Sequence, residues 1–170
     1  MKSMSEYSIV SVDKISKKEE VVAPPKDNLV KLYNLCVEMS KLCCENDGVG
    51  LAAVQIGIPW KLFIICRMPT DLHFMIDCEY EPVDDVKRQS VEGCLSLRTS
   101  MGKLRHFKVE RHEKIRVVGQ ELLADDKLHL EPIDKIIDGY MAVVYQHEID
   151  HAKGILISDI GEEIVVSKGM

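Results

Sequence analysis

The chain has 170 residues, a length that suits one domain with a single hydrophobic core. Hydrophobic residues make up 46% and charged residues 29%, an ordinary globular balance, and the net charge of −6 excludes a general electrostatic attraction to nucleic acid or anionic membranes. No apolar run reaches the ~18 residues of a transmembrane helix, and the N-terminus lacks the pattern of a secretory signal, so we expect a cytoplasmic protein.

The N-terminal part is predicted to contain an arm and then a helix. Residues 1–26 are polar and include a Pro-Pro pair, so we expect an extended, partly flexible arm with a short strand at residues 7–12. Asp27 or Asn28 can cap the following helix. This helix, predicted to end near residues 46–48, has one apolar stripe made of Leu29, Leu32, Cys36, Met39 and Cys43.

Residues 48–59 are small and apolar except for one polar side chain, Gln55. Their glycines permit positive φ angles and a close approach of the backbone to a ligand. A phosphate-binding loop is excluded because no Gly-Lys-Ser/Thr sequence follows, which leaves a tight loop packed against a strand as the purely structural alternative. A buried amide needs hydrogen-bond partners, and one partner of Gln55 could be a substrate.

Short strands are expected in the middle of the chain. They are predicted at residues 61–66, 72–76, 109–117 and 128–130, the last of them closed by Pro132. Residues 79–88 are acidic and are expected to be irregular, and the basic residues 98–107 are expected to form a flexible loop.

From Ile133 the pattern turns helical. One face is formed by Ile136, Tyr140, Val143 or Val144, His147 and His151, and Gly154 is a natural stop. Residues 155–160 and 164–166 are short apolar pieces with β character. The order of elements predicts an α+β fold, with mostly antiparallel short strands around a central helix, and a single domain over residues 27–170.

The second helix carries a candidate metal site. His147 and His151 lie one turn apart on a helix, where two imidazoles can bind one divalent ion. A solvated helix that happens to carry two histidines is the alternative, but both residues continue the apolar stripe. Glu148 can reach a water held at the metal, which makes it a candidate general base.

A catalytic metal usually has three protein ligands, so a further ligand is needed. The residues after His151 include Glu162 and Glu163 but no histidine, and the third ligand is therefore expected upstream. Cys94 is the best candidate, because it lies beside Gly93 where the backbone can turn tightly and because a thiolate binds divalent metals strongly. The other five cysteines are expected to be reduced, buried thiols: Cys36, Cys43, Cys44, Cys66 and Cys78.

Three segments together resemble the peptide deformylase family. They are GVGLAAVQ at residues 48–55, EGCLS at residues 92–96 and QHEIDH at residues 146–151, and their order and approximate spacing are those of the family's signature motifs. The resemblance implies the deformylase fold for residues 27–170 as a catalytic domain. It also implies an enzyme that hydrolyses the N-formyl group of N-formyl-methionyl nascent peptides and releases formate.

The resemblance further implies a role for each matching residue. Cys94, His147 and His151 would bind the metal, and Glu148 would act as general acid and base. Gln55 and the backbone N–H of Leu95 would hold the oxyanion. Substrate contacts are expected from the backbone of Gly50 and from Val49, Val143 and Val144 as walls of the methionine pocket. Glu92 and Arg111 resemble the family's acid–arginine pair behind the ligands. Asp150 could orient a ligand imidazole or face solvent.

The resemblance implies one divalent metal ion, Fe²⁺ in the working enzyme, with Zn²⁺, Ni²⁺ or Co²⁺ able to occupy the same ligands; the donor set alone favours zinc by abundance. No nucleic-acid or membrane partner is expected. Association with the ribosome would be transient, since no C-terminal docking helix is evident.

Two alternatives to the deformylase function remain. One is another small HExxH metallopeptidase, which would leave Cys94 and Gln55 without roles, and the other is a non-catalytic protein that binds formyl-peptides.

Overall fold

The computed structural model describes residues 7–166. Its helices are α1 (Leu29–Glu45), α2 (Gly139–Ala152) and the short α3 (Ile157–Ile160). Short 3-10 turns occupy Val12–Lys14, Lys18–Glu20 and Ala53–Ile56. The strands are β1 (Gly50–Ala52), β2 (Leu62–Met68), β3 (Asp71–Pro82), β4 (Lys87–Arg98), β5 (Leu104–His112), β6 (Lys114–Ala124), β7 (Leu128–Asp138) and β8 (Glu162–Ile164).

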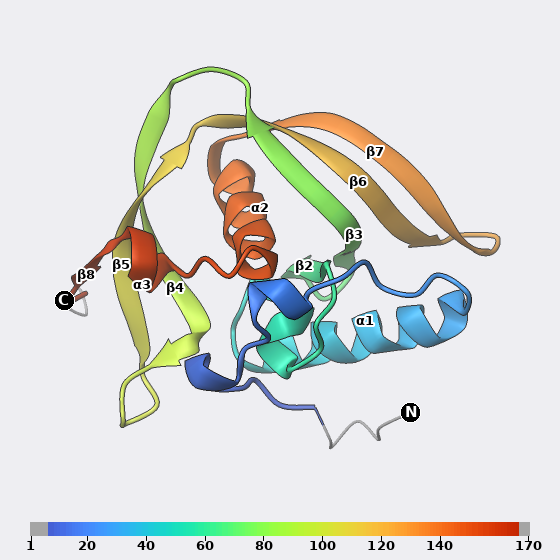
Figure 1. The fold of residues 1–170 in the computed structure, drawn as a ribbon, viewed down its shortest axis with the longest axis horizontal. Helices are drawn as coiled ribbons and strands as arrows, with labels where there is room; N and C mark the ends of the chain where they lie inside the picture. Colours follow the sequence, from blue (N-terminus) through green and yellow to red (C-terminus); the bar gives the residue numbers. More distant parts are fainter. Residues whose placement is uncertain (1–6, 167–170) are drawn as a thin grey trace.

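The strands of the described residues form two sheets. The larger sheet has the order β1-β2-β3-β6-β7 and the smaller one the order β4-β5-β8, and the strands pair in antiparallel fashion throughout. Figure 1 shows α2 in the middle of the molecule, with β4 and β5 on one side and the long strands β3, β6 and β7 on the other. The predicted α+β fold, with antiparallel strands around a central helix, is confirmed.

The first helix forms as its sequence predicts. The Asn28 side chain caps α1 by accepting a hydrogen bond from the Lys31 N–H at 3.0 Å. Four residues of the predicted stripe are buried, and the fifth, Leu29, packs against them from the edge. Together they cover the β2 and β3 face of the larger sheet, and this apolar burial holds α1 against the sheet.

The N-terminal arm is anchored to the domain without forming a strand. Among the described residues 7–12 there is only irregular chain and the start of a 3-10 turn, so the predicted strand is wrong. The Val10 N–H donates to the Gln55 carbonyl at 2.8 Å, and Val22 forms an isolated parallel bridge with Trp60. Residues 1–6 of the predicted arm lie outside the described part of the chain.

The chain changes sheet between β5 and β6, where a single strand was predicted over residues 109–117. β5 belongs to the smaller sheet and β6 to the larger one, with only Glu113 between them. The alternating inward residues remain buried on both sides of this break; they are Val109, Arg111, Ile115 and Val117. The prediction of one strand is wrong because alternation shows which side chains face inward, not which sheet the backbone joins.

Two segments predicted to lack regular structure are partly strand. Residues 79–88 contain the end of β3 and the start of β4, and residues 83–86 link them. Residues 98–107 form the turn between β4 and β5, closed by the hydrogen bond from the Thr99 N–H to the Lys103 carbonyl at 2.8 Å, and then the start of β5. Their charged side chains point to solvent from paired strands, which composition alone does not distinguish from a loop.

The second helix begins later than predicted. Residues 133–138 belong to β7, which pairs with β6 along its whole length, so the helical start at Ile133 is wrong. Ile136 is 62% exposed and does not belong to the helical stripe. Because β7 is an edge strand, Pro132 can lie inside it without leaving a neighbouring carbonyl unpaired. The predicted stop is confirmed, since Gly154 has a φ of +72° just after α2.

The C-terminal segment is mixed in structure. Residues 157–160 form α3, so the β character predicted for 155–160 is wrong, while β8 covers part of the last apolar piece.

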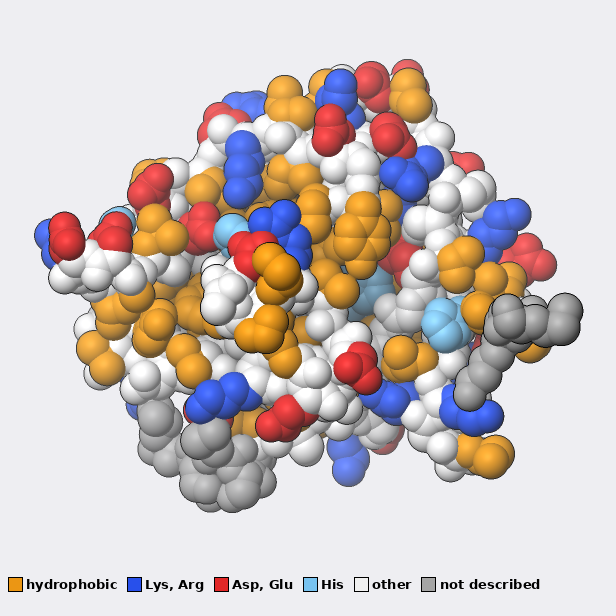
Figure 2. Space-filling model, turned by 180° about the vertical axis from the view of Figure 1, so that it is seen from behind, with side chains coloured by type: hydrophobic (Ala, Val, Ile, Leu, Met, Phe, Trp, Pro, Cys, Tyr) orange, Lys and Arg blue, Asp and Glu red, His pale blue; other side chains and the backbone are white. Residues whose placement is uncertain are grey.

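Figure 2 shows acidic and basic side chains interspersed over the face seen from behind, in keeping with the modest net charge. Among the described residues, the structure has no helix long and apolar enough to cross a membrane.

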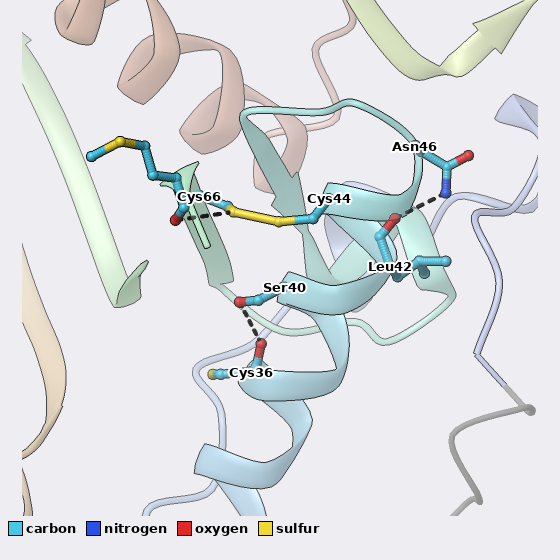
Figure 3. The surroundings of a disulfide bond; sticks show 7 residues. Cys36, Ser40, Leu42, Cys44, Asn46 and Cys66 are labelled. Carbon is cyan, nitrogen blue, oxygen red and sulfur yellow. Dashed lines mark hydrogen bonds between the residues drawn. A yellow bond between two sulfur atoms is a disulfide. The ribbon is translucent and has the colours of Figure 1, made fainter. Parts of the chain in front are cut away.

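Two of the cysteines form a disulfide, which the prediction of reduced, buried thiols missed. Cys44 lies in the last turn of α1, on the exposed side of the buried stripe, and it is bonded to Cys66 of β2. Figure 3 shows this bond joining the end of the helix to the strand. Three of the five thiols predicted to be reduced and buried are so: Cys36, Cys43 and Cys78. Cys94, predicted to be a metal ligand, is also free and buried.

We expect the disulfide to stabilise the folded protein measurably. The two cysteines have a sequence separation of 22. A cross-link that closes a loop of this size in the unfolded chain lowers its entropy and raises the free energy of unfolding by about 3 kcal/mol. Cys44→Ser is therefore expected to lower the melting temperature of the oxidised protein to that of the reduced wild type. Denatured, unreduced wild type should show four reactive thiols of its six cysteines. Six thiols before reduction would contradict the pairing.

Candidate metal centre

The central helix presents two imidazoles on one face. His147 and His151 are one turn apart on α2, and their ring centroids are 4.9 Å apart. His151 is 2% exposed, and burial together with the charges of His147 and Arg111 lowers its pKa well below the usual value. Its ring is therefore neutral, the form that offers a lone pair to a metal.

Strand β4 brings a thiol to the same point. Cys94 Sγ lies 3.6 Å from His151 Nε2, and one ligand atom from each of Cys94, His147 and His151 lies within 4.8 Å of the others. No other cluster of this kind occurs among residues 7–166. One sulfur and two imidazole nitrogens suit a tetrahedral divalent site with a fourth position free, so the residues present fit the expected metal.

The His147 ring is held from behind by a carboxylate. Its Nδ1 lies 2.9 Å from Glu92 Oε1, which leaves Nε2 to face the cluster. Burial disfavours a charge on His147, but hydrogen bonding to Cys94 and Glu92 outweighs it and raises the pKa of the ring to about 10. A cation at the cluster would displace that proton from the ring, since only the neutral imidazole binds metal.

Alternate residues of β4 face the centre. Ser90, Glu92, Cys94 and Ser96 follow one another at a spacing of two, the period of a strand. The Ser90 hydroxyl donates to Glu92 Oε2 at 2.6 Å, and Ser96 accepts from Gln55. Neither Ser90 nor Ser96 was predicted as a site residue, although this spacing is a signal that identifies them.

Gln55 is fixed beside the thiol. It lies in the turn Ala53–Ile56, is 1% exposed, and its Oε1 accepts the Ala52 N–H at 3.0 Å. Its Nε2 then points to β4, where it donates to Ser96 Oγ at 3.1 Å and to Cys94 Sγ at 3.4 Å. An amide with its oxygen held in this way presents N–H donors to the centre.

Glu148 is buried next to the two imidazoles. Burial raises the pKa of its carboxyl to about 7, which suits a group that both accepts and gives up a proton near neutral pH. Its Oε2 is buried without a hydrogen-bond partner among the described residues. A buried carboxylate oxygen of this kind is available to a water or a substrate.

The backbone of Gly50 packs directly against this carboxylate. A Cβ placed at Gly50 would lie 2.5 Å from Glu148 Oε1, closer than any van der Waals contact. Gly50→Ala is therefore expected to displace the carboxylate or strand β1 and to lower kcat/KM about 10- to 100-fold, as misplacement by about 1 Å does elsewhere. Metal content should stay unchanged. A variant with wild-type kinetics would show that the carboxylate position is not critical.

Glu92, Arg111 and Asp150 form a buried ionic group behind the ligands. Arg111 donates from Nε and Nη2 to the two oxygens of Glu92, both at 2.9 Å, and from Nη1 to Asp150 Oδ2 at 2.7 Å. Burial alone would raise the pKa of Glu92, but the hydrogen bonds from His147 and Arg111 prevail and lower it to about 2. Asp150 is buried, so the suggestion that it faces solvent is wrong, and it makes no direct hydrogen bond to a ligand imidazole.

A cavity of about 430 Å³ opens onto this centre. Its lining includes the predicted residues Val49, Gly50, Gln55, Glu92, Cys94, Leu95, Val143, Val144, His147 and Glu148. His151 and Arg111 are buried and do not line the cavity. Further lining residues were not predicted, among them Arg88, Val91, Leu104, His106 and Tyr140. No local pattern could have identified this set, because it comes from β4, β5 and α2 together.

Comparisons with known proteins agree with this geometry. Residues 8–164 match the family model of polypeptide deformylases. The peptide deformylase of Rhodopirellula baltica is 35% identical over 139 residues, which covers 78% of this chain and only 63% of that relative. The peptide deformylase of Aquifex aeolicus is 33% identical over 133 residues, covering 76% of this chain and 72% of that protein. The crystal structure of Thermotoga maritima peptide deformylase has a TM-score of 0.72 and 28% identity, covering 91% of this chain and 96% of that chain.

Proposed function

Because this chain belongs to the polypeptide deformylase family, we propose that it hydrolyses the formyl group from the N-terminal formylmethionine of nascent peptides. The reaction consumes one water and yields formate and a free α-amino group. The observation that carries the proposal is the cluster of Cys94, His147 and His151 at a cavity that also exposes Glu148 and Gln55. The catalytic domain predicted over residues 27–170 stays a prediction.

We propose that Cys94, His147 and His151 hold one divalent ion. A bound ion would supply positive charge that lowers the pKa of a neighbouring water, so that a nucleophile forms near neutral pH. Fe²⁺ is the proposed ion in the working enzyme, and the same sulfur and nitrogen donors also suit Zn²⁺, Ni²⁺ or Co²⁺. Glu92 keeps the His147 ring in place through its 2.9 Å contact with Nδ1.

The protein's own residues then carry the proton transfers and the charge stabilisation. Glu148 takes a proton from the attacking water and later gives it to the leaving amine, a dual role that a pKa of about 7 favours. Gln55 Nε2 and the Leu95 N–H donate to the oxyanion that develops on the formyl oxygen. Because the Gln55 amide is already held by Ala52 and Ser96, only its long contact with Cys94 Sγ has to be given up when that charge develops.

The cavity walls position the substrate. Val49, Val143 and Val144 are proposed to pack around the methionine side chain, and the Gly50 backbone to hydrogen-bond the peptide. Only a small residue at position 50 leaves room for both the peptide and Glu148. The proposed partner is the formylated nascent peptide, met in the cytoplasm as it leaves the ribosome, with at most a transient ribosome contact.

The test is formate release from an N-formyl-methionyl peptide by anaerobic, Fe²⁺-loaded protein, compared with the unformylated peptide. We expect formate in an amount equal to the new amino groups. Cleavage of internal peptide bonds without formate would favour a general metallopeptidase. Tight binding of the formyl-peptide with no turnover would favour a non-catalytic binding protein. Either result would overturn the proposed activity.

A further inference from the structure

A continuous path of hydrogen bonds leads from His147 to a side chain outside the cavity. The first part of the path is rigid. His147 Nδ1 contacts Glu92 Oε1, and Glu92 is held by two parallel hydrogen bonds from Arg111, each 2.9 Å long. A guanidinium and a carboxylate joined in this way share one plane, so the orientation of Arg111 fixes that of Glu92.

The second part of the path extends to β3. Arg111 Nη1 donates to Asp150 Oδ2 at 2.7 Å, and the Tyr80 hydroxyl donates to Asp150 Oδ1 at 3.0 Å. The side chains of Arg111 and Asp150 are 3% and 4% exposed. Burial raises the pKa of the Tyr80 phenol, which therefore keeps its proton and remains a donor.

Tyr80 determines whether Asp150 has one partner or two. Arg111 satisfies one carboxylate oxygen and Tyr80 the other, so the Asp150 side chain is held at both oxygens. Without the hydroxyl, a buried oxygen would lose its partner, and the carboxylate would be free to turn. Because the Arg111 guanidinium is planar and stiff, a tilt at its Asp150 end is transmitted to its Glu92 end.

We infer that Tyr80 is a positioning residue for the metal centre, which acts through Asp150, Arg111 and Glu92 to orient the His147 ring. Tyr80 does not line the cavity, so it has no contact with a substrate there. Its own ring is held in turn by Lys153, whose Nζ lies 4.5 Å from the ring centroid. The inference rests on the proposed function, because it takes His147 as a ligand.

A purely structural role for Tyr80 would be to tie β3 to α2. Tyr145 provides a matched control, because it also joins α2 to β3, through a hydroxyl that lies 3.7 Å from the Met75 sulfur and has no link to the ionic group. Tyr80→Phe and Tyr145→Phe each remove one half-buried or buried hydroxyl. Both can lower stability, but only the first should change the metal centre.

The experiment loads Co²⁺ into wild type and both variants. The visible absorption of the bound cobalt reports its ligand geometry. The rate at which cobalt leaves the protein is measured by its transfer to an excess of chelator. In Tyr80→Phe we expect shifted bands and dissociation faster by up to about tenfold, since loss of a direct supporting hydrogen bond to a ligand costs at least that much and Tyr80 acts through three intervening side chains. Tyr145→Phe should match wild type in both.

The result that overturns the inference is a Tyr80→Phe protein with wild-type bands and dissociation, even if its melting temperature falls. Neither cobalt measurement needs a formyl-peptide. If wild type releases no formate but Tyr80→Phe still changes the cobalt bands, the proposed reaction fails while the positioning role stands. If wild type binds no cobalt, both are overturned.

Discussion

Glu148→Gln is expected to reduce formate release about 10³-fold while the protein keeps its metal, because general acid–base catalysis by one residue contributes roughly 10²- to 10⁴-fold. Glutamine keeps the shape of the side chain, which matters where the Gly50 backbone packs against Glu148. It removes the ability to take a proton from water and return it to the amine. The measurement is kcat on a formyl-methionyl peptide, together with the metal content.

This loss should not come from unfolding. Burial raises the pKa of Glu148 in the folded protein from 4.5 to about 7. Ionisation of this carboxyl therefore opposes folding, and its cost grows as the pH rises from about 4.5 to about 7. A neutral amide avoids that cost, so the melting temperature of Glu148→Gln at neutral pH should be no lower than that of wild type.

Glu162→Gln is the matched control, because it makes the same chemical change on the exposed strand β8. It should keep wild-type kcat and metal content. If Glu148→Gln turns over within tenfold of wild type, Glu148 is not the residue that carries the proton transfers. The attacking water would then have no assigned base.

Cys94→Ala is expected to weaken metal binding by more than about 100-fold. Loss of a residue that only hydrogen-bonds a metal ligand costs up to about 100-fold, and loss of the ligand itself should cost more. Cys94 supplies the one sulfur of the cluster, and its loss leaves two imidazoles, too few for a stable catalytic site. The measurement is metal retained against a chelator, followed by formate release after reloading.

Cys43→Ala controls for removing a buried thiol near the site. Cys43 is fully buried, and burial raises the pKa of its thiol to about 12, so it is not a thiolate. The Cys43→Ala variant should retain metal as wild type does. If Cys94→Ala held metal equally well, the third ligand would have to be sought elsewhere.

Much of the site follows from local sequence patterns. The spacing of His147 and His151 places two imidazoles on one face of any helix, whatever surrounds it. The stripe of α1 and its Asn28 cap are likewise determined by neighbours a few residues away, and both are found as predicted. Gln55 stood out as the one polar side chain of an apolar stretch and Cys94 as the best third ligand, and the family resemblance then implied their roles. They lie far apart in sequence and are joined in the structure by a 3.4 Å contact.

Local patterns leave open which segments of the chain pair with one another. Inward residues alternate at Val109 and Arg111 and again at Ile115 and Val117, and the chain changes sheet at Glu113 between them, because the choice of strand partner depends on the assembled fold. The pairing of Cys44 with Cys66 and the hydrogen bond of Asp150 with Tyr80 are contacts between distant segments. The helical spacing that presents two imidazoles follows from the local sequence. Which buried group holds the His147 ring depends on the fold, because Glu92 comes from β4 and its partner Arg111 from β5.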